Sequence, residues 1–416
     1  MKVLMFGWEF PPHISGGLGT ACYGLTKALA TQDIEIIFVV PKMYGDEDQS
    51  QLQLVGANKV PVGIRRFNFK DVVKEVDYVE VGSNLIPYVS EDDYYNIVTK
   101  KVDFDKYVTE ASEHGCLHFD GGYGGGLFQE VSNYAVVAKS VAAMFDFDVI
   151  HAHDWLTYPA AIAAKEVSGK PLVVHVHATE FDRSGEHVHQ YVYDIERTGM
   201  HAADRVITVS HLTRNIVINR YGINSEKVIT VHNAVDHSGI ADTVTFEKAF
   251  DDKIVTFLGR ITFQKGPEYF VEAAYKVLQT NKNVKFVMAG SGDLLERMIH
   301  RAAELGITSK FHFTGFLKGD DVVKMLNISD VYVMPSVSEP FGISPLEAMR
   351  SNVPVIISKQ SGVSEVLKHA IKIDFWDVDA MADAINGLLK YDGLNKMFKE
   401  HAKTEVENLK WDNTAV

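Results

Sequence analysis

Short apolar runs alternate along the chain with longer stretches whose apolar residues recur every three or four positions. The short runs are typical of buried strands and the longer stretches of amphipathic helices, so the pattern predicts an α/β fold with parallel sheets. In the first half we predict strands at Lys2–Phe6, Glu35–Val40, Val149–His153, Pro171–His177, Arg205–Val209 and Val228–Val231. Helices are predicted at Thr20–Thr31, Asn133–Met144, Pro159–Val167 and His187–His201.

The alternation stops at the polar stretch His232–Thr243, which we interpret as a linker, and then resumes. The later predicted strands are Ile254–Leu258, Val284–Ala289, Lys310–Thr314, Val331–Met334 and Val355–Ser358. The later predicted helices are Pro267–Thr280, Leu294–Leu305 and Pro345–Ser351. This predicts two Rossmann-like domains facing across a cleft, beside the carboxyl ends of the strands, where open α/β sheets bind ligands.

Composition narrows the class of protein. The chain has 416 residues, 46% of them hydrophobic and 23% charged, which is enough apolar material for full cores. Its net charge of −14 argues against a nucleic-acid partner, because such proteins usually present a basic face. Cys22 and Cys116 are too few for a disulfide framework. No signal peptide or membrane span is evident, so a cytoplasmic soluble enzyme is the expectation.

Two cations follow the first strand predicted after the linker. Arg260 and Lys265 are five residues apart, and Gly259 and Gly266 beside them would allow a ligand to approach closely. They could be surface cations, but the spacing favours contact with phosphate. Fixed cations there would stabilise the charge that builds on a departing nucleoside diphosphate, which would make a metal unnecessary.

Two carboxylates lie further along, on either side of a Pro-Phe-Gly turn. Glu339 and Glu347 are eight residues apart, a separation suited to addressing sugar hydroxyls on both sides of the turn. Glu347 has a structural alternative, since Ser344-Pro-Leu-Glu347 also fits a capping box with Ser344 as the N-cap. Both interpretations predict that a helix begins near Ile343–Ser344.

Glycine-rich turns occur at three places. Gly16-Gly-Leu-Gly19 follows a predicted strand and opens a helix, which suits either a phosphate contact or an ordinary tight turn. Gly290-Ser-Gly-Asp293 has the same two interpretations, and Gly121–Gly126 is interpreted as a turn. None has the Gly-x-Gly-x-x-Gly spacing of a dinucleotide site, which disfavours an oxidoreductase.

Histidines and aspartates at the strand ends raise the question of a metal. His151 and His153 share one face of a strand, and His175 and His177 share one face of the next. We interpret His151, His153 and His175 as packing residues. Asp146-Phe-Asp148 has the form of a metal-binding pair, but its place before a strand favours a cap. No metal site is predicted.

Six motifs occur together in a family-specific order: Gly16–Gly19, Val149-Ile-His-Ala-His-Asp-Trp155, Val174-His-Val-His177, Val231-His-Asn-Ala-Val-Asp236, Leu258–Gly266 and Ser336–Met349. The chain thereby resembles retaining glycosyltransferases of the GT-B architecture, above all glycogen and starch synthases and glycosyltransferase family 4. The resemblance implies an acceptor-side domain over 1–238, a nucleotide-sugar-binding domain over 239–400, and the start of a C-terminal crossover helix over 401–416, with Trp411 near its beginning.

The resemblance also implies functional residues. The catalytic residues would be His177, Asp154, Arg260, Lys265 and Glu339. The donor-binding residues would be Gly17, Gly290, Phe316, Leu317, Gly342, Ile343, Ser344 and Glu347. No cofactor is implied, and the donor would be ADP-glucose or UDP-glucose. Ile14 stands where the synthases have Lys, a departure that leans toward family 4. Ala178 stands where they have Asn, so one sugar contact is expected to be absent.

The expected activity is retaining transfer of a hexose, most simply glucose, from a nucleotide sugar to the end of an α-glucan. One alternative is a family 4 enzyme acting on a lipid, a saccharide or a small acceptor. A second is a nucleotide-sugar 2-epimerase, which would release no transferred product. The sequence does not choose between ADP and UDP donors and does not give the oligomeric state.

Overall fold

The computed structural model describes residues 1–13, 16–47, 49–50, 52–62, 116–124, 126–235, 248 and 251–415. Within these ranges no helix is both long enough and apolar enough to cross a bilayer. Contacts divide the chain into two compact units. The first unit is Met1–His175 with Thr198–Arg205, and the second is Val176–Arg197 with Val206–Val416.

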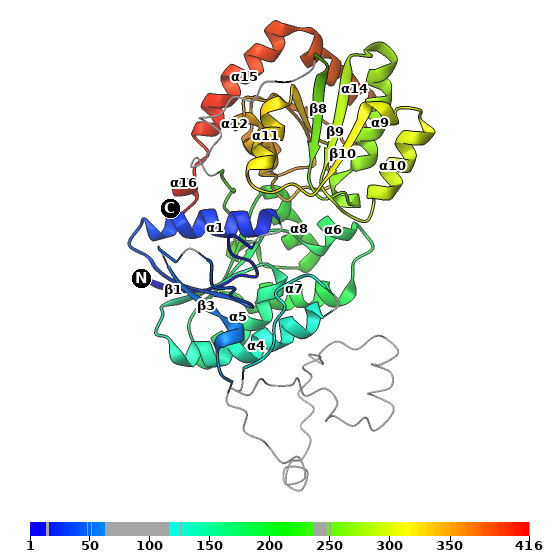
Figure 1. Ribbon diagram of the computed structural model, residues 1–416. Coiled ribbons are helices and arrows are strands. Elements are labelled where there is room, and N and C mark those ends of the chain that lie inside the picture. The colour runs from blue at the N-terminus through cyan, green and yellow to red at the C-terminus, as the bar shows by residue number, and fades with distance from the viewer. Residues whose placement is uncertain are drawn as a thin grey trace, which may run out of the picture. The chain divides into compact units, whose positions relative to one another are not determined.

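One sheet has seven strands in the order β3-β2-β1-β4-β5-β6-β7. Figure 1 labels β1 and β3 among them. Parallel pairing joins β1 to β2 and β4, and β6 to β7. The strands are β1 (Lys2–Phe6), β2 (Glu35–Val40), β3 (Gln53–Gly56), β4 (Val149–His153), β5 (Leu172–Val176), β6 (Arg205–Thr208) and β7 (Val228–Thr230). Their helices are α1 (Gly17–Ala30), α4 (Leu127–Met144), α5 (Tyr158–Ser168), α6 (Glu180–Ser184), α7 (Gln190–Ala202) and α8 (His211–Tyr221).

The other sheet has six parallel strands in the order β10-β9-β8-β11-β12-β13. They are β8 (Lys253–Leu258), β9 (Val284–Ala289), β10 (Phe311–Gly315), β11 (Val331–Met334), β12 (Val355–Ser358) and β13 (Ile371–Ile373). The helices are α9 (Pro267–Thr280), α10 (Leu295–Glu304), α11 (Asp320–Ile328), α12 (Ser344–Arg350), α13 (Val363–Val366), α14 (Val378–Lys390), α15 (Asp392–Glu407) and α16 (Trp411–Ala415).

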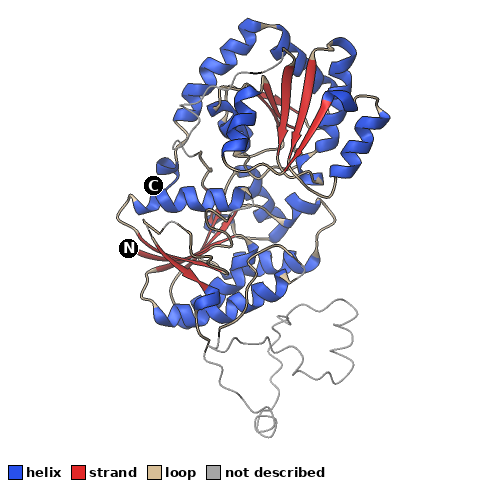
Figure 2. Cartoon of the chain, viewed as in Figure 1, coloured by secondary structure: helices blue, strands red, loops and turns tan. Residues whose placement is uncertain are grey.

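Both faces of this second sheet are buried, as Figure 2 shows by the helices on either side. Along β8, Ile254 packs into one apolar cluster and Val255 into another. The same alternation occurs on β9, where Phe286 and Val287 belong to different clusters. Successive side chains of a strand point to opposite faces, so a strand covered on both faces is a continuous apolar run. This is why the runs in the sequence predicted these strands so directly.

Most predicted elements are confirmed, with shifts of a few residues at some ends. Lys2–Phe6, Glu35–Val40, Val149–His153, Val284–Ala289, Val331–Met334, Val355–Ser358 and Pro267–Thr280 end where predicted. The sequence does not predict β3, α6, α8, α11, α13, β13, α14 and α15, because their apolar patterns are short or diluted by polar residues. Of the predicted linker only His232–Val235 is described; its remainder, like Ile14, lies outside the described residues.

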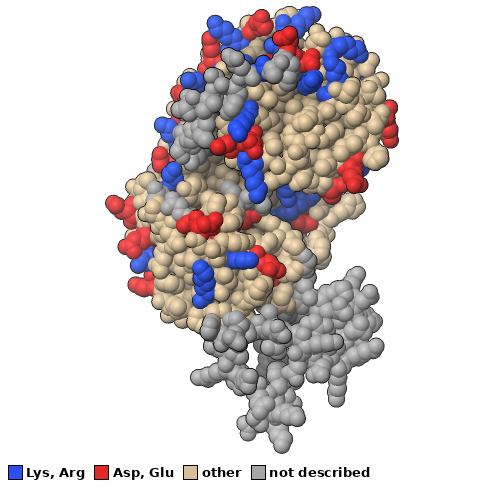
Figure 3. Space-filling view, in the orientation of Figure 1, with Lys and Arg blue, Asp and Glu red and all other residues tan. Residues whose placement is uncertain are grey.

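Charges of both signs are interspersed over the face shown in Figure 3, and no single-sign field covers it. An anionic donor is therefore expected to be held by local cations. Near the end of the chain, Trp411 is buried at the start of α16. The hydroxyl of Thr414 donates to the carbonyl of His232 at 3.0 Å, which fixes this short helix. The predicted domain boundaries and the crossover helix stay predictions.

Candidate functional site

The candidate site lies at the carboxyl ends of β8 and β11, which are neighbours in the sheet although far apart in sequence. The loop after β8 carries Arg260 and Lys265, and the loop after β11 carries Glu339. The two loops are joined by backbone, since the Val337 N–H donates to the Gln264 carbonyl at 2.9 Å. The strand order changes direction at this pair, and such a switch point is where open α/β sheets bind ligands.

Glycine is required where these loops meet. Gly266 has a φ of +62°, and a Cβ there would lie 2.2 Å from the Pro335 carbonyl oxygen. Gly290, after β9, has a φ of +141°, and its Cβ would lie 1.8 Å from the Gly259 carbonyl oxygen. Since only glycine tolerates both the conformation and the close approach, the three loops pack backbone against backbone.

Lys265 and Glu339 form an ion pair. The Lys265 ammonium donates to Oε2 of Glu339, and the Ser336 hydroxyl donates to the same oxygen at 3.2 Å. The side chains are 22% and 8% exposed, so both charges are largely withdrawn from water. The sequence predicted separate ligands for these residues, phosphate for the cation and sugar for the carboxylate. In the structure each is the partner of the other.

Arg260 is placed differently. Its side chain is exposed, and within the described ranges its side chain makes one hydrogen bond, a long contact of 3.5 Å from Nη2 to Oε1 of Gln264. A guanidinium carries five N–H donors, so most of this group's hydrogen-bonding capacity is available to a ligand. The structure therefore places one weakly held and one paired cation on the same loop.

The loop after β10 joins this group. The Gly290 N–H donates to the Gly315 carbonyl at 2.9 Å, which connects the ends of β9 and β10. The next residue, Phe316, has 51% of its surface exposed, and Leu317 is half-buried. An exposed aromatic ring and a backbone loop at this position suit contact with a flat base.

The residues after Glu339 complete the β11 loop. Gly342 has a φ of +100°, and a Cβ there would lie 3.1 Å from Cγ of Glu339. Ile343 is the N-cap of α12, and Ser344 is its first helical residue. The predicted capping box is wrong, because the Ser344 hydroxyl accepts a hydrogen bond from Tyr332 at 2.8 Å and caps no backbone N–H. The hydrogen bond from Tyr332 on β11 therefore takes the place of the bond from the backbone that a cap would make.

Glu347 has no part in capping either. Among the described residues its carboxylate has no hydrogen bond and no ion pair. Burial raises the pKa of this carboxyl group, and the charge of Arg350 lowers it by less. Burying a carboxylate without a hydrogen-bond donor costs free energy, and a bound ligand with hydroxyl groups would offset that cost by supplying the donors.

His177 follows β5 and is half-buried in the second unit. Four ionisable groups that the sequence reasoning did not single out lie on the next two helices, Glu180, Asp182 and Arg183 on α6 and Glu196 on α7. The Arg183 guanidinium donates to Glu196 at 2.8 Å and to Glu180 at 3.3 Å. A sequence signal was available, since Thr179-Glu-Phe-Asp182 has the spacing of a capping box, and here the box is formed.

Asp154 and Gly17 belong to the first unit. Asp154 is buried directly after β4, with a φ of +65°, which is rare for a residue that is not glycine. Its N–H donates to the His175 carbonyl at 2.9 Å. Gly17 is the first residue of α1. Such backbone strain is often retained at functional positions.

The three histidines interpreted as packing residues are buried in the first unit. The ring centroids of His151 and His153 are 4.3 Å apart, and those of His151 and His175 are 5.6 Å apart. Burial lowers the pKa of His151 to about 4, so this imidazole is neutral. Their ring nitrogens lie within 4.8 Å of one another, so these three side chains form one of the described groups that could hold a metal ion. Asp148, from the Asp146-Phe-Asp148 pair, accepts a hydrogen bond from the Lys2 N–H at 2.7 Å.

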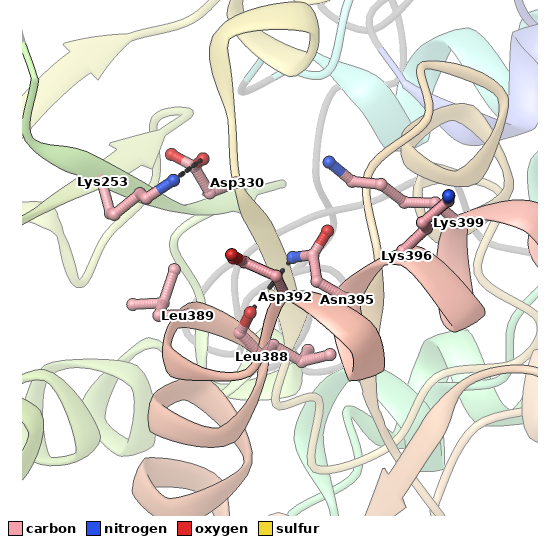
Figure 4. Close-up of a pocket in the computed structure, with 8 residues that line it drawn as sticks. All are labelled: Lys253, Asp330, Leu388, Leu389, Asp392, Asn395, Lys396 and Lys399. Carbon is pink, nitrogen blue, oxygen red and sulfur yellow. Dashed lines mark hydrogen bonds and ion pairs between the residues drawn. The ribbon is translucent and has the colours of Figure 1, made fainter.

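A separate pocket of about 370 Å³ in the second unit involves none of these residues (Figure 4). It lies between Lys253, the first residue of β8, Asp330, which precedes β11, and α15 residues such as Lys399. This is the amino edge of the strands, opposite to the edge at which such sheets bind ligands. We therefore do not assign the donor to it.

Comparison with known proteins identifies the family. The sequence matches the family described as Glycosyltransferase Family 4 over residues 123–238 and the family described as Glycosyl transferases group 1 over residues 242–405. This chain is a GT-B glycosyltransferase of family 4. The two matched regions together make up most of its length.

Relatives of this family 4 glycosyltransferase extend over its whole length. An uncharacterised glycosyltransferase of Methanocaldococcus jannaschii is 27% identical and covers 100% of this chain and 96% of its own. A glycogen synthase of Mycobacterium tuberculosis is 22% identical over 94% of this chain and 86% of its own. The names of both relatives describe sugar-transferring enzymes, and at 22% identity the glycogen synthase is a distant homologue.

Solved structures share the fold of this glycosyltransferase. A sucrose-phosphate synthase from Thermosynechococcus elongatus matches with a TM-score of 0.71 at 15% identity, covering 100% of this chain and 96% of that one. The Anabaena protein HepE, solved with UDP and glucose, matches with a TM-score of 0.67 at 16% identity, covering 100% and 97%. These likenesses confirm the GT-B fold predicted from the sequence.

Proposed function

We propose that this family 4 glycosyltransferase moves glucose from a nucleotide sugar to the end of an α-glucan, with retention and without a metal. The observation that carries the proposal is the convergence of Arg260, Lys265 and Glu339 at the switch point of the second sheet. The glycogen synthase relative supports the acceptor, and the neighbour solved with UDP and glucose supports the donor.

The cations are assigned to the diphosphate. When the bond between the sugar's anomeric carbon and the diphosphate breaks, negative charge builds on the bridging oxygen. Arg260 and Lys265 would stabilise that charge, each by about 2–4 kcal/mol, in the manner of an oxyanion hole. Lys265 first has to exchange Glu339 for phosphate, which frees the carboxylate for the sugar.

The carboxylates are assigned to hydroxyl groups. Glu339, released from Lys265, would accept hydrogen bonds from the donor sugar. Glu347, whose carboxylate has no hydrogen bond within the part of the chain that the structure describes, would accept them from the ribose. Gly290, Phe316 and Leu317 are assigned to the base, and Gly342, Ile343 and Ser344 to the diphosphate and sugar.

Retention is assigned to attack on the face that the diphosphate leaves. The acceptor oxygen forms its bond to the anomeric carbon as the bond to the diphosphate breaks, and the acceptor's proton passes to the departing phosphate oxygen. His177 and Asp154 are assigned to orienting the sugar. No carboxylate nucleophile is required, unlike in the double-displacement route of retaining glycosidases.

An acceptor screen tests the proposal. The enzyme is incubated with ADP-glucose or UDP-glucose and with glycogen or malto-oligosaccharides, and the product is digested with an α-glucan-specific hydrolase. Elongation to a digestible product supports the proposal. Failure to elongate any α-glucan with either donor, alongside transfer to a lipid or a small sugar, would replace it.

A second acceptor class is favoured by one observation. Where synthases place Asn after the key histidine, this chain has Ala178, whose side chain cannot hydrogen-bond a sugar and whose carbonyl accepts from Arg183 at 3.2 Å. A lipid, saccharide or small acceptor is therefore the alternative. Formation of a 2-epimer with no transferred product would instead indicate the epimerase.

A further inference from the structure

One buried carboxylate organises the turn that follows His177. Oδ2 of Asp182 accepts a hydrogen bond from the Thr179 N–H at 2.7 Å and another from the Thr179 hydroxyl at 2.8 Å. Asp182 is 1% exposed and Thr179 is fully buried. The first of these bonds belongs to the capping box of α6, whose other half is the Asp182 N–H donating to the Thr179 side chain. Both bonds use only one of the two carboxylate oxygens.

The other oxygen reaches the loop after β11. The Ser338 hydroxyl donates to Oδ1 of Asp182 at 2.6 Å, a bond between residues 156 positions apart in sequence. Ser338 directly precedes Glu339. The residue before it, Val337, donates its N–H to the carbonyl of Gln264, which directly precedes Lys265.

Through these bonds Asp182 connects the segments that carry three predicted functional residues, His177, Lys265 and Glu339. One of its oxygens fixes the turn that begins two residues after His177. The other is bonded to the neighbour of Glu339, and that segment is bonded by backbone to the neighbour of Lys265. The positions of these three residues can therefore depend on Asp182 although none of them is bonded to it directly.

Stabilising α6 is not a sufficient reason for this arrangement. The helix has five residues, and its capping box would be complete without Ser338. Burial raises the pKa of Asp182, so keeping the carboxylate there costs free energy that the bonds from Ser338 and Thr179 offset. Buried, fully bonded polar groups of this kind are a common means of fixing a single geometry.

We propose that Asp182 is a positioning residue that, through Ser338, holds the His177 turn in register with the loop carrying Lys265 and Glu339. The inference rests on the proposed function for its catalytic consequence. The nucleoside diphosphate is assigned to residues on the loops of the second sheet, such as Arg260 and Lys265, and not to His177. Its binding therefore does not require the bond between Asp182 and Ser338.

Ser338→Ala is the most selective variant, because it removes the bond to Asp182 and leaves the capping box intact. We expect kcat for transfer to fall about tenfold, since small displacements of catalytic groups have effects of this size. The Kd of UDP or ADP should be unchanged. Ser338→Thr keeps a hydroxyl and should restore kcat. Asp182→Asn should lower kcat, and adding Ser338→Ala to it should lower kcat little further, because the two residues act as one unit.

Ser329→Ala is the matched control. It removes a serine hydroxyl that, like that of Ser338, makes a 2.6 Å bond to another side chain, here Thr256, but that lies away from both loops. It should lower the melting temperature without changing kcat. If Ser338→Ala behaves like this control, or if its effect and that of Asp182→Asn multiply, Asp182 is a structural residue and the inference is wrong.

A readout that does not need transfer separates this inference from the proposed function. The NMR signals of the His177 imidazole, assigned with His177→Gln, should move in Ser338→Ala and return in Ser338→Thr. A wild-type enzyme without transfer activity would refute the proposed function, while these signals still decide the positional link. Signals that stay in place in Ser338→Ala would refute the link even in an active enzyme.

Discussion

The Lys265 ammonium donates to the carboxylate of Glu339, 74 positions further along the chain, and the Ser336 hydroxyl donates to the same oxygen. Both side chains are largely buried, so neither charge is compensated by water alone. The pair keeps a cation and an anion in the site before a ligand arrives. In a bound nucleotide sugar, the phosphate can take the place of Glu339 as the partner of Lys265, and the sugar hydroxyls can take the place of Lys265 as the partners of Glu339.

Lys265→Ala and Arg260→Ala should separate catalysis from stability. Each should lower kcat by about 10²–10³-fold, because each removes one charge that stabilises the departing diphosphate. Lys265→Ala should also lower the melting temperature, since it leaves the Glu339 carboxylate buried without its cation. Arg260 is exposed, so its variant should melt like the wild type. Near-normal turnover in either variant would make these cations ordinary surface residues.

The pair should also be separable by a double-mutant cycle. Lys265→Met and Glu339→Gln should each destabilise the fold, because each leaves one buried charge alone. The double variant should recover part of that loss, since both charges are then absent. Transfer should remain low in all three. Stability losses that simply add, measured by urea unfolding, would mean that the two side chains do not interact in solution.

Glu347 should affect donor affinity and not helix stability. Burial raises the pKa of Glu347, and no described residue donates a hydrogen bond to its carboxylate, so Glu347→Gln should leave stability unchanged or slightly higher at pH 7. Donor affinity should fall, since a ribose ligand would be lost. Glu347→Ala should behave the same way. A lower melting temperature in Glu347→Ala with normal donor affinity would restore the capping interpretation.

Glu196 should make stability depend on pH. Burial raises its pKa to about 7, with Arg183 and Tyr221 opposing the shift. The folded state therefore favours the protonated form of Glu196. Relative to high pH, this protonation adds fully to the free energy of unfolding below pH 4.5, and the added stability is lost as the pH rises through about 7. Between pH 5 and pH 8 the wild type should lose up to about 3 kcal/mol that Glu196→Gln does not lose. Urea unfolding at the two pH values measures the difference, and parallel pH profiles would contradict it.

The strands were predictable because a parallel sheet covered on both faces requires continuous apolar runs, and Val284–Ala289 or Val331–Met334 satisfy that requirement by themselves. The candidate residues were predictable through family motifs. Glycines such as Gly290 were recognised as a turn, but their need to meet another backbone was visible only in the structure.

Pairings between distant positions could not be predicted. Nothing local to Lys265 indicates that its partner is Glu339, and nothing local to Ser338 indicates Asp182. The capping box at Ser344 shows the opposite error. Its local pattern was correct for a helix start, but Tyr332 on a neighbouring strand takes the hydroxyl, so a tertiary contact overrides the local one.

Arg260 and Lys265 are proposed to take the place of a metal at the leaving diphosphate. The most direct test is the rate of glucose transfer by the purified enzyme in excess EDTA, with Arg260→Ala measured alongside. We predict that EDTA leaves the wild-type rate unchanged, while Arg260→Ala is slow with or without it. Complete loss of transfer in EDTA, restored by Mg²⁺ or Mn²⁺, would contradict the claim.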